Sequence, residues 1–274
     1  MKAMFEMPET ITYALPERIG NTDLFVGRKK EFDYYLGDWY YYLVNNMARS
    51  QAIVARRRKG KTAFLERLFN ILWSCSESKV IPFFYVMQER QITLASFAKD
   101  FFATFVSHYL SFLTRNKDWV LSPLNYMEMK KYITQYPDLY KKSISIDEFE
   151  KTGNWDLMWS VARRTPFDIA VSTGVKVVQI IDEFQNINAY IVNERGKTID
   201  SMSGAYRDLA ERKEAPLIVS GSEVHRLLEI LCRLTAGFAE NVLENLPEEE
   251  AKEAVWKYAQ ATDTRIDEHA VEKI

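Results

Sequence analysis

The sequence predicts an α/β fold, in which a parallel sheet carries helices on both faces. Short apolar runs typical of buried strands alternate with segments whose apolar residues recur at helical spacing, and this alternation is typical of a helix-covered parallel sheet. Three of the apolar runs, 52–54, 177–181 and 216–219, are followed at once by polar or glycine-containing segments. These segments are expected at the carboxyl edge of the sheet, where open α/β folds bind ligands.

The composition is that of a globular protein with a sizeable core. The chain has 274 residues, of which 47% are hydrophobic and 27% are charged, and this length suits one large domain or a core with a small appendage. The formal net charge is −2. Electrostatics therefore give no argument for nucleic acid as the dominant partner, although a local basic face is compatible with this value.

Targeting signals and metal-ligand spacings are not found in the sequence. The first residues lack the apolar centre of a signal peptide, and no apolar run approaches the roughly 20 residues that span a bilayer. A cytoplasmic protein without a membrane partner is therefore expected. Cys75 and Cys232 lie far apart, and both are expected to be small core residues in a reducing compartment. The three scattered histidines argue against a histidine-based metal site.

The amino-terminal part of the chain begins with a segment that has little periodicity. Residues 1–22 are expected to form an extended leader. The apolar stripe of residues 29–45 predicts a core helix. Tyr34, Tyr40 and Tyr41 fall partly off this stripe, and they either lie at the margin of the core or form a partner surface. The next predicted elements are a strand at 52–54, a helix from Thr62 to about Trp73, and a strand at 80–86 whose first half is weakened by Pro82.

The middle of the chain is mostly helical in pattern. Residues 93–115 are strongly apolar with helical spacing, and residues 117–174 predict a helical insertion that is broken near Pro123, Pro137 and Gly153. The remaining predicted elements are strands at 177–181, 216–219 and 241–243 and helices at about 200–212, 247–261 and 266–274.

The segment from Ala55 to Thr62 is the most informative motif. It reads Ala-Arg-Arg-Arg-Lys-Gly-Lys-Thr and lies between a predicted strand and a predicted helix, which is the context of a phosphate-binding loop. Such a loop curls backbone N–H groups around phosphate oxygens at a helix N-terminus. Gly60 allows close approach of the backbone, Lys61 reaches the outer phosphates, and the Thr62 hydroxyl is a ligand for Mg²⁺.

The loop also contains a basic run from Arg56 to Lys59. Contact with nucleic acid is one interpretation of such a run. Its position within the loop instead favours phosphates and solvent as its neighbours.

A pair of carboxylates, Asp182 and Glu183, follows the apolar strand at 177–181. At the carboxyl edge of the sheet, Asp182 would bind Mg²⁺ directly or through water, and Glu183 would orient and deprotonate a water that attacks the γ-phosphate. Acidic residues often simply end a strand, so the pair is informative because a Gly-Lys-Thr motif lies upstream.

The strand at 216–219 ends in Ser220-Gly221-Ser222. Ser222, with Ser220 as the reserve, is the candidate to offer a hydroxyl to the γ-phosphate or the attacking water. The competing interpretation is a serine that satisfies the backbone of a turn.

Together these motifs resemble those of the AAA+ superfamily of P-loop ATPases, and within it the archaeal-type ATPases that approach the STAND class and the Orc1/Cdc6-like initiators. The resemblance covers roughly residues 23–274, and the motifs stand in the family's order. The matching segments are Phe-Val-Gly-Arg-Lys-Lys-Glu at 25–31, the arginine-rich loop at 56–62, Asp-Glu-Phe at 182–184, Gly-Ser at 221–222, and the start of a helical lid at 246–251.

The resemblance implies a P-loop NTPase core of five parallel strands, in which the 216–219 strand lies between the loop strand and the Asp-Glu strand. It divides the chain into a nucleotide-binding core at 23–245 and the start of a lid at 246–274. ATP and Mg²⁺ are the implied ligands, with Thr62 and Asp182 at the ion and Glu183, Lys61 and Ser222 in catalysis. The implied nucleotide contacts are Val26, Gly27, Arg28, Arg57, Arg58, Lys59, Gly60, Lys61, Thr62 and Ala63.

The sequence departs from the family's pattern in three ways. Ala55 replaces the first glycine of the loop, where a positive φ would cost about 1 kcal/mol. Gly237 is followed by Phe238 rather than by arginine, so no arginine finger is assigned and Arg233 is only a nearby candidate. The resemblance further implies that the chain ends within the lid.

The sequence therefore predicts a Mg²⁺-dependent ATPase whose nucleotide state moves the lid relative to the core and acts on a partner. The missing arginine finger motivates an alternative, a nucleotide-sensing scaffold with little hydrolysis. A DNA-processing initiator or transposition ATPase rests on family analogy alone. A homo-oligomer, and a DNA or protein partner bound outside the core, are further expectations on the same basis.

Overall fold

The fold is built around a five-stranded parallel sheet with the strand order β2-β4-β6-β1-β7. A computed structural model of the protein describes residues 5–234 and 237–271. The expected number of strands, and the position of β6 between β1 and β4, are both confirmed. The strands of this sheet are β1 (Ser50–Val54), β2 (Val80–Val86), β4 (Lys176–Asp182), β6 (Leu217–Gly221) and β7 (Phe238–Val242).

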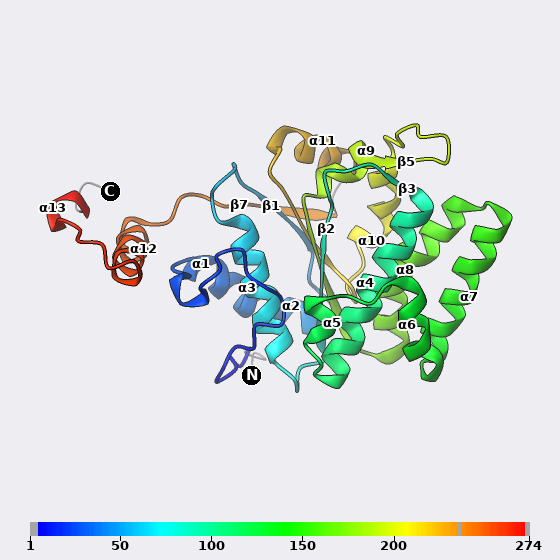
Figure 1. Ribbon diagram of the computed structural model, residues 1–274, viewed down its shortest axis with the longest axis horizontal. Helices are drawn as coiled ribbons and strands as arrows, with labels where there is room; N and C mark the ends of the chain where they lie inside the picture. The colour runs from blue at the N-terminus through cyan, green and yellow to red at the C-terminus, as the bar shows by residue number, and fades with distance from the viewer. Residues whose placement is uncertain (1–4, 235–236, 272–274) are drawn as a thin grey trace.

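Helices cover both faces of the sheet, because parallel strands need crossover connections. Figure 1 shows α1, α2 and α3 on one face and α4 to α8 on the other. Helices α12 and α13 lie beyond the segment that follows β7, on the side of α1. The helices are α1 (Lys29–Phe32), α2 (Tyr40–Val44), α3 (Lys61–Ser74), α4 (Leu94–Thr114), α5 (Asp118–Leu121), α6 (Tyr126–Tyr132), α7 (Pro137–Thr152), α8 (Trp155–Thr173), α9 (Ile187–Tyr190), α10 (Arg207–Ala210), α11 (Val224–Leu234), α12 (Glu248–Ala261) and α13 (Glu268–Val271).

The first predicted helix is continuous but not uniform. A π-helical stretch, Asp33–Trp39, joins α1 to α2. Tyr34 and Tyr40 are half-buried and pack against Tyr35 and Phe5. These tyrosines therefore lie at the margin of the core.

Strand β2 runs through Pro82, so the expected weakening of its first half is wrong. Among the described strands, β2 lies at the edge of the sheet and pairs with β4 alone. The N–H of Phe84 donates to His108 Nδ1 at 3.2 Å, so this N–H points away from β4. The nitrogen of Pro82, two residues earlier, faces the same way, and its missing hydrogen removes no bond of the sheet.

The insertion at 117–174 is helical in pieces, as predicted. Pro123 lies between α5 and α6, Pro137 is the first residue of α7, and Gly153 caps the end of α7 with φ of 70°. Proline suits the first position of a helix because that position needs no N–H donor. Aromatic side chains join α4 to α8, as in the 4.6 Å contact between the rings of Phe97 and Trp159.

Several local expectations are wrong. The helix expected near 200–212 is a 3-10 helix, Met202–Tyr206, followed by the short α10. The two-residue strands β3 (Ile92–Thr93) and β5 (Ile191–Val192) form a second parallel sheet that the sequence did not predict. Cys75 is only partly buried and Cys232 is exposed, so they are not core residues. The end of the helix expected at 266–274 lies outside the described residues.

The leader is fixed along α3. Glu17 forms a bidentate contact with Arg67, with N–O distances of 2.7 and 2.8 Å. The backbone of Leu15 exchanges two hydrogen bonds with the side chain of Asn70, at 2.8 and 2.9 Å. Residues 5–21 contain no regular helix or strand, and these contacts hold them against the helix that follows the phosphate loop. Within the described part of the chain, every helix is too short or too polar to span a bilayer.

Candidate functional site

The register of the sheet brings Asp182 beside Ser220. Ile181 of β4 pairs with Val219 of β6, so the next residues along the two strands are neighbours. The Ser220 hydroxyl donates a hydrogen bond to Asp182 Oδ1. The Thr62 hydroxyl, from the first turn of α3, donates to Oδ2 at 2.7 Å. The fully buried Asp182 carboxylate is therefore fixed by both the sheet and the helix.

Lys61 lies between the two carboxylates that the sequence predicted. Its Nζ is 3.3 Å from Asp182 Oδ1 and 3.3 Å from Glu183 Oε1, and its side chain is 7% exposed. A buried cation is tolerated when opposite charges and hydrogen bonds surround it. The predicted ammonium and both predicted carboxylates thus form one cluster.

Glu183 lies on a turn with a left-handed backbone, φ 54°. Its Oε2 accepts hydrogen bonds from Ser222 N at 3.0 Å, from Ser222 Oγ at 2.8 Å and from Gln185 Nε2 at 2.6 Å. Burial raises the pKa of the carboxyl, but the hydrogen bonds from Gln185 and Ser222 and the charge of Lys61 outweigh it and bring the pKa to about 2. Glu183 is therefore ionised at neutral pH.

The phosphate-loop geometry differs from expectation at Ala55. Ala55 is buried and is not among the left-handed residues, so the expected cost of a positive φ does not arise. The left-handed positions of the loop are Arg58, φ 66°, and Gly60, φ 75°. Gly60 precedes α3 and provides no side-chain cap. The first N–H groups of this 14-residue helix are thus suited to an anion.

A cleft of about 570 Å³ opens beside the loop. It is bordered by the leader, by the turn before α1, by the phosphate loop and by the segment that leads into α12. Six of the ten predicted nucleotide contacts line it. Of the other four, Gly27 borders an adjoining cavity, Arg57 is exposed outside it, and Lys61 and Thr62 belong to the cluster around Asp182 and Glu183. The lining residues are Ile19, Leu24, Phe25, Val26, Arg28, Arg58, Lys59, Gly60, Ala63, Asn245, Leu246, Glu248, Ala251, Ala254 and Tyr258.

Arg28 connects this turn to the phosphate loop. Its guanidinium donates to the carbonyl of Lys59 at 2.5 Å and pairs with Glu31 at 3.2 Å. The side chain is buried. Arg28 thus fixes the position of the loop backbone, a role that the sequence did not suggest.

Glu250 of α12 reaches the same turn from the other end of the chain. Its carboxylate accepts the N–H of Arg28 at 2.8 Å and the N–H of Lys29 at 3.4 Å. A Cβ at Gly27 would lie 2.4 Å from Glu250 Oε2. Glycine is therefore needed at position 27 both for its φ of 79° and for this close approach.

Three residues of the site were missed or misjudged in the sequence. Ser220 is the fixed partner of Asp182 rather than a reserve for Ser222. Gln185 follows the Asp-Glu-Phe motif directly, and its position two residues after Glu183 was the only available signal. Glu250 lies in a run of three glutamates at the start of a helix. Acidic residues are common there because they interact favourably with the helix dipole, so nothing in the sequence distinguished Glu250 from its neighbours.

The oxygen atoms near Lys61 suit a magnesium ion. Thr62 Oγ1 and Asp182 Oδ2 lie 2.7 Å apart, and hydroxyl and carboxylate oxygens are the hard ligands that Mg²⁺ prefers. The donor set predicted from the sequence therefore fits this ion.

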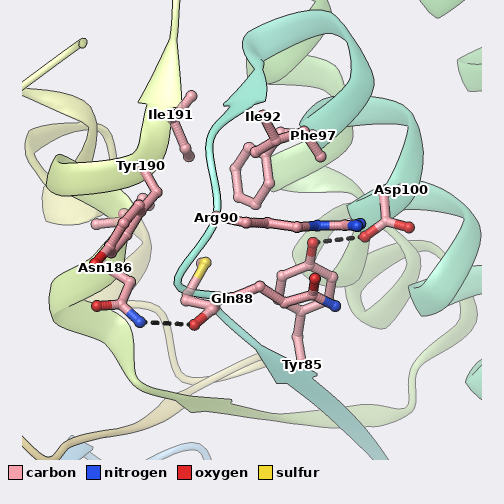
Figure 2. A pocket seen from close by; sticks show the side chains of 11 residues that line it. Tyr85, Gln88, Arg90, Ile92, Phe97, Asp100, Asn186, Tyr190 and Ile191 are labelled. Carbon is pink, nitrogen blue, oxygen red and sulfur yellow. Dashed lines mark hydrogen bonds between the residues drawn. The ribbon is translucent and has the colours of Figure 1, made fainter.

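A smaller pocket lies at the carboxyl ends of β2 and β4, and Figure 2 shows it lined by Tyr85, Arg90, Asp100 and Tyr190. Its volume is about 20 Å³, which is room for about one water. The Tyr85 hydroxyl is already bonded to Asp100 at 2.7 Å. The 570 Å³ cleft is therefore the better candidate for a nucleotide.

Comparison with known proteins identifies the fold. No protein-family model matches the sequence, and no curated protein matches it. Among solved structures, the Walker-type ATPase of Pyrococcus abyssi is similar, with a TM-score of 0.56 and 15% identity over 94% of this chain. The Orc1 protein of Aeropyrum pernix, solved in complex with DNA, is similar with a TM-score of 0.51 and 12% identity over 91% of this chain.

This chain spans 63% of the first protein and 53% of the second. Both likenesses cover more than nine-tenths of this chain. The chain therefore has the fold of AAA+ P-loop ATPases, as its motifs predicted.

Proposed function

We propose that the protein is an ATPase that binds ATP with Mg²⁺ at the carboxyl edge of the sheet and uses Glu183 as the base. One observation carries the proposal. Side chains from three segments that are far apart in the sequence, the start of α3, the end of β4 and the end of β6, form one hydrogen-bonded cluster around Lys61, Asp182 and Glu183. The cluster contains the types of residue that phosphoryl transfer requires.

The phosphates would bind at the start of α3. The loop amides and the helix dipole favour an anion there, and Lys61 supplies a point charge for the outer phosphates. The base and ribose would occupy the adjoining cleft, whose volume of about 570 Å³ lies within the usual range of ligand sites, roughly 300–1,000 Å³. Val26 and Ala63 supply apolar lining to the cleft.

Thr62 and Asp182 would hold Mg²⁺, which neutralises phosphate charge when it is bound. Glu183 is ionised and held by Ser222, so it can accept a proton from a water beside it. Ser222 donates its hydroxyl to Glu183, and it would therefore lie near the same water. Catalysis would thus depend on Glu183, Lys61 and Ser222.

Residues 246–271 would act as the start of a lid that responds to the nucleotide and acts on a partner. This proposal is supported by the position of α12 at the cleft, where Ala251, Ala254 and Tyr258 line one side. A protein or DNA partner, and assembly of several copies, are part of the same proposal. The Orc1 structure contains DNA, which makes DNA the first partner to test.

The proposal is tested with Glu183→Gln. This variant keeps the shape of the side chain and removes the base, so it should bind ATP as the parent does and release phosphate at least about 100-fold more slowly. Glu244→Gln is the control. It removes the same charge at an exposed position after β7, and it should keep the parental rate. Phosphate release by Glu183→Gln at the parental rate would contradict the proposal.

Measuring the rate of phosphate release at several protein concentrations separates an ATPase completed by a neighbouring copy from a nucleotide-sensing scaffold. A rate that rises steeply with concentration indicates that a neighbouring copy completes the site. Tight ATP binding with negligible release at every concentration, with and without DNA, would instead support a nucleotide-sensing scaffold.

A further inference from the structure

We propose that Gln185 is the positioning residue of Glu183, and that Gly221 is glycine because the Gln185 amide occupies the space of its side chain. The inference rests on the proposed ATPase function. It adds two residues, neither of which touches the substrate.

The contact between Gln185 and Glu183 is direct and shielded from water. Gln185 is 2% exposed, and its Nε2 donates to Glu183 Oε2 at 2.6 Å. The same Nε2 lies 3.4 Å from Asn186 Oδ1. A flipped amide would direct its oxygen at both of these acceptors, so the orientation is fixed. A hydrogen bond to a carboxylate in such a place is stronger than a neutral one.

The turn that carries Gln185 is anchored on both sides. Asn186 Nδ2 donates to the carbonyl of Met87 at 2.8 Å, which Figure 2 shows beside the small pocket. The N–H of Met87 in turn donates to the carbonyl of Asp182 at 2.9 Å. The segment Phe184–Asn186 is therefore tied to the end of β2, which fixes the backbone that carries Gln185.

Gly221 makes room for this arrangement. A Cβ at position 221 would lie 2.1 Å from Gln185 Oε1 and 3.1 Å from its Cδ. Even a methyl group would displace the amide. The next residue, Ser222, donates to the same Glu183 oxygen, so the carboxylate is held between β6 and the turn.

The arrangement is costly for the folded protein. Gln185 Oε1 is buried without a hydrogen-bond partner, and such a group costs about 1–3 kcal/mol. A methionine would fill the same space without that cost. Unlike methionine, glutamine supplies an Nε2 donor, and this donor forms a hydrogen bond with Glu183, the proposed base.

The chain contains a matched control. Gln179, on β4, is also fully buried and also has a buried Oε1 without a partner. Its Nε2 donates to the backbone carbonyl of Ala215 at 2.8 Å, far from Glu183. The same substitution at the two positions therefore separates loss of a buried amide from loss of the contact with Glu183.

Gln185→Met should lower kcat about 10- to 100-fold and change KM less than about 3-fold, because ATP binding does not need the base. Gln179→Met should leave kcat within about 2-fold of the parent. Equal losses in the two variants would show that Gln185 has only a structural role and would overturn the inference.

Gly221→Ala tests the second half of the inference. Alone it should lower kcat about as much as Gln185→Met. In a Gln185→Ala background, where the alanine leaves space for the new methyl group, Gly221→Ala should have little further effect. Losses that simply multiply would show that Gly221 acts independently of Gln185.

Crystal structures of the parent and of Gln185→Met give a readout that does not depend on turnover. In the variant the Glu183 carboxylate should leave its contacts with Ser222. An unchanged carboxylate would overturn the inference whatever the rates are. Turnover that is equally absent from the parent and from Glu183→Gln would contradict only the proposed function.

Discussion

The two ends of the candidate site are built in different ways. At the phosphate end, Lys61, Asp182 and Glu183 are held by side chains from the sheet and from α3, within a largely buried cluster. At the base end, the 570 Å³ cleft is bordered by irregular segments and by α12, and its walls come from positions as far apart as 19 and 258. Under the proposed function, the chemistry would depend on the sheet edge and α3, whereas recognition of the base would depend on irregular segments and α12.

The difference follows from the cost of burying charge. A buried ammonium or carboxylate without a partner is strongly destabilising, so the charged groups of the phosphate end must be paired. Contacts between partly exposed groups contribute only about 0–1 kcal/mol each. At the base end, Glu250 of α12 contacts the turn before α1, and Lys59 of the phosphate loop contacts Asn245 before α12, all at partly or fully exposed positions. Substitutions should therefore have graded effects along the site.

The largest effect is expected at Lys61. Lys61→Ala removes the charge that the phosphates would contact, and we expect ATP affinity to fall about 1,000-fold, or about 4 kcal/mol. Isothermal titration calorimetry with ATP and Mg²⁺ measures this change.

Lys59→Ala is the matched control. Lys59 lies two residues earlier and contacts Asn245 rather than the carboxylates, so its loss should change affinity by less than about 10-fold. Comparable losses in both variants would contradict the distinction between the two ends.

The phosphate end could be predicted from the sequence, because its residues lie in short contiguous motifs. Gly60, Lys61 and Thr62 form one motif, and Asp182 and Glu183 form another. A phosphate-binding motif fixes its own local geometry, and parallel strands bring their carboxyl ends together. The motifs therefore predicted the parallel sheet and the residues of the central cluster, and the family resemblance implied five strands with β6 between β1 and β4.

The remaining features depend on tertiary contacts that no local pattern records. Gln185 matters because Gly221, 36 positions later, lacks a Cβ. Glu250 meets Arg28 across 222 positions. Pro82 is tolerated because β2 lies at an edge, which only the whole sheet decides. At the base end the resemblance implied Val26, Gly27 and Arg28, but no local pattern indicated that Ala254 and Tyr258 of the distant α12 form another wall.

An intermediate effect is expected where the leader meets α3. Glu66, one turn after Thr62, is 4% exposed and accepts the N–H of Arg18 at 2.7 Å. Burial raises the pKa of its carboxyl from 4.5 to about 7, although the backbone and charge of Arg18 oppose the rise. A raised pKa means that the folded state favours the proton. The stability it contributes is complete below pH 4.5 and is lost as the pH rises through 7.

Glu66→Gln should remove this dependence, because glutamine keeps an acceptor for Arg18 and carries no charge. The parent should lose up to about 3 kcal/mol of unfolding free energy between pH 5 and 8, and the variant should lose less. Urea denaturation at several pH values measures both. Glu77→Gln, at an exposed position, should behave as the parent does, and equal pH slopes for Glu66→Gln and the parent would contradict the assignment.

The smallest effect is expected at Glu250, whose contact with the turn before α1 ties α12 to the base end. Glu250→Ala should weaken ATP binding about 3- to 10-fold, or about 1 kcal/mol, because the Glu250 carboxylate, which accepts the two N–H hydrogen bonds, is only partly buried. Glu249→Ala removes the same charge from the adjacent, exposed position and should leave affinity unchanged. If Glu250→Ala instead abolished binding as Lys61→Ala does, the base end would be as rigidly built as the phosphate end. An unchanged affinity would show that α12 borders the cleft without holding its shape.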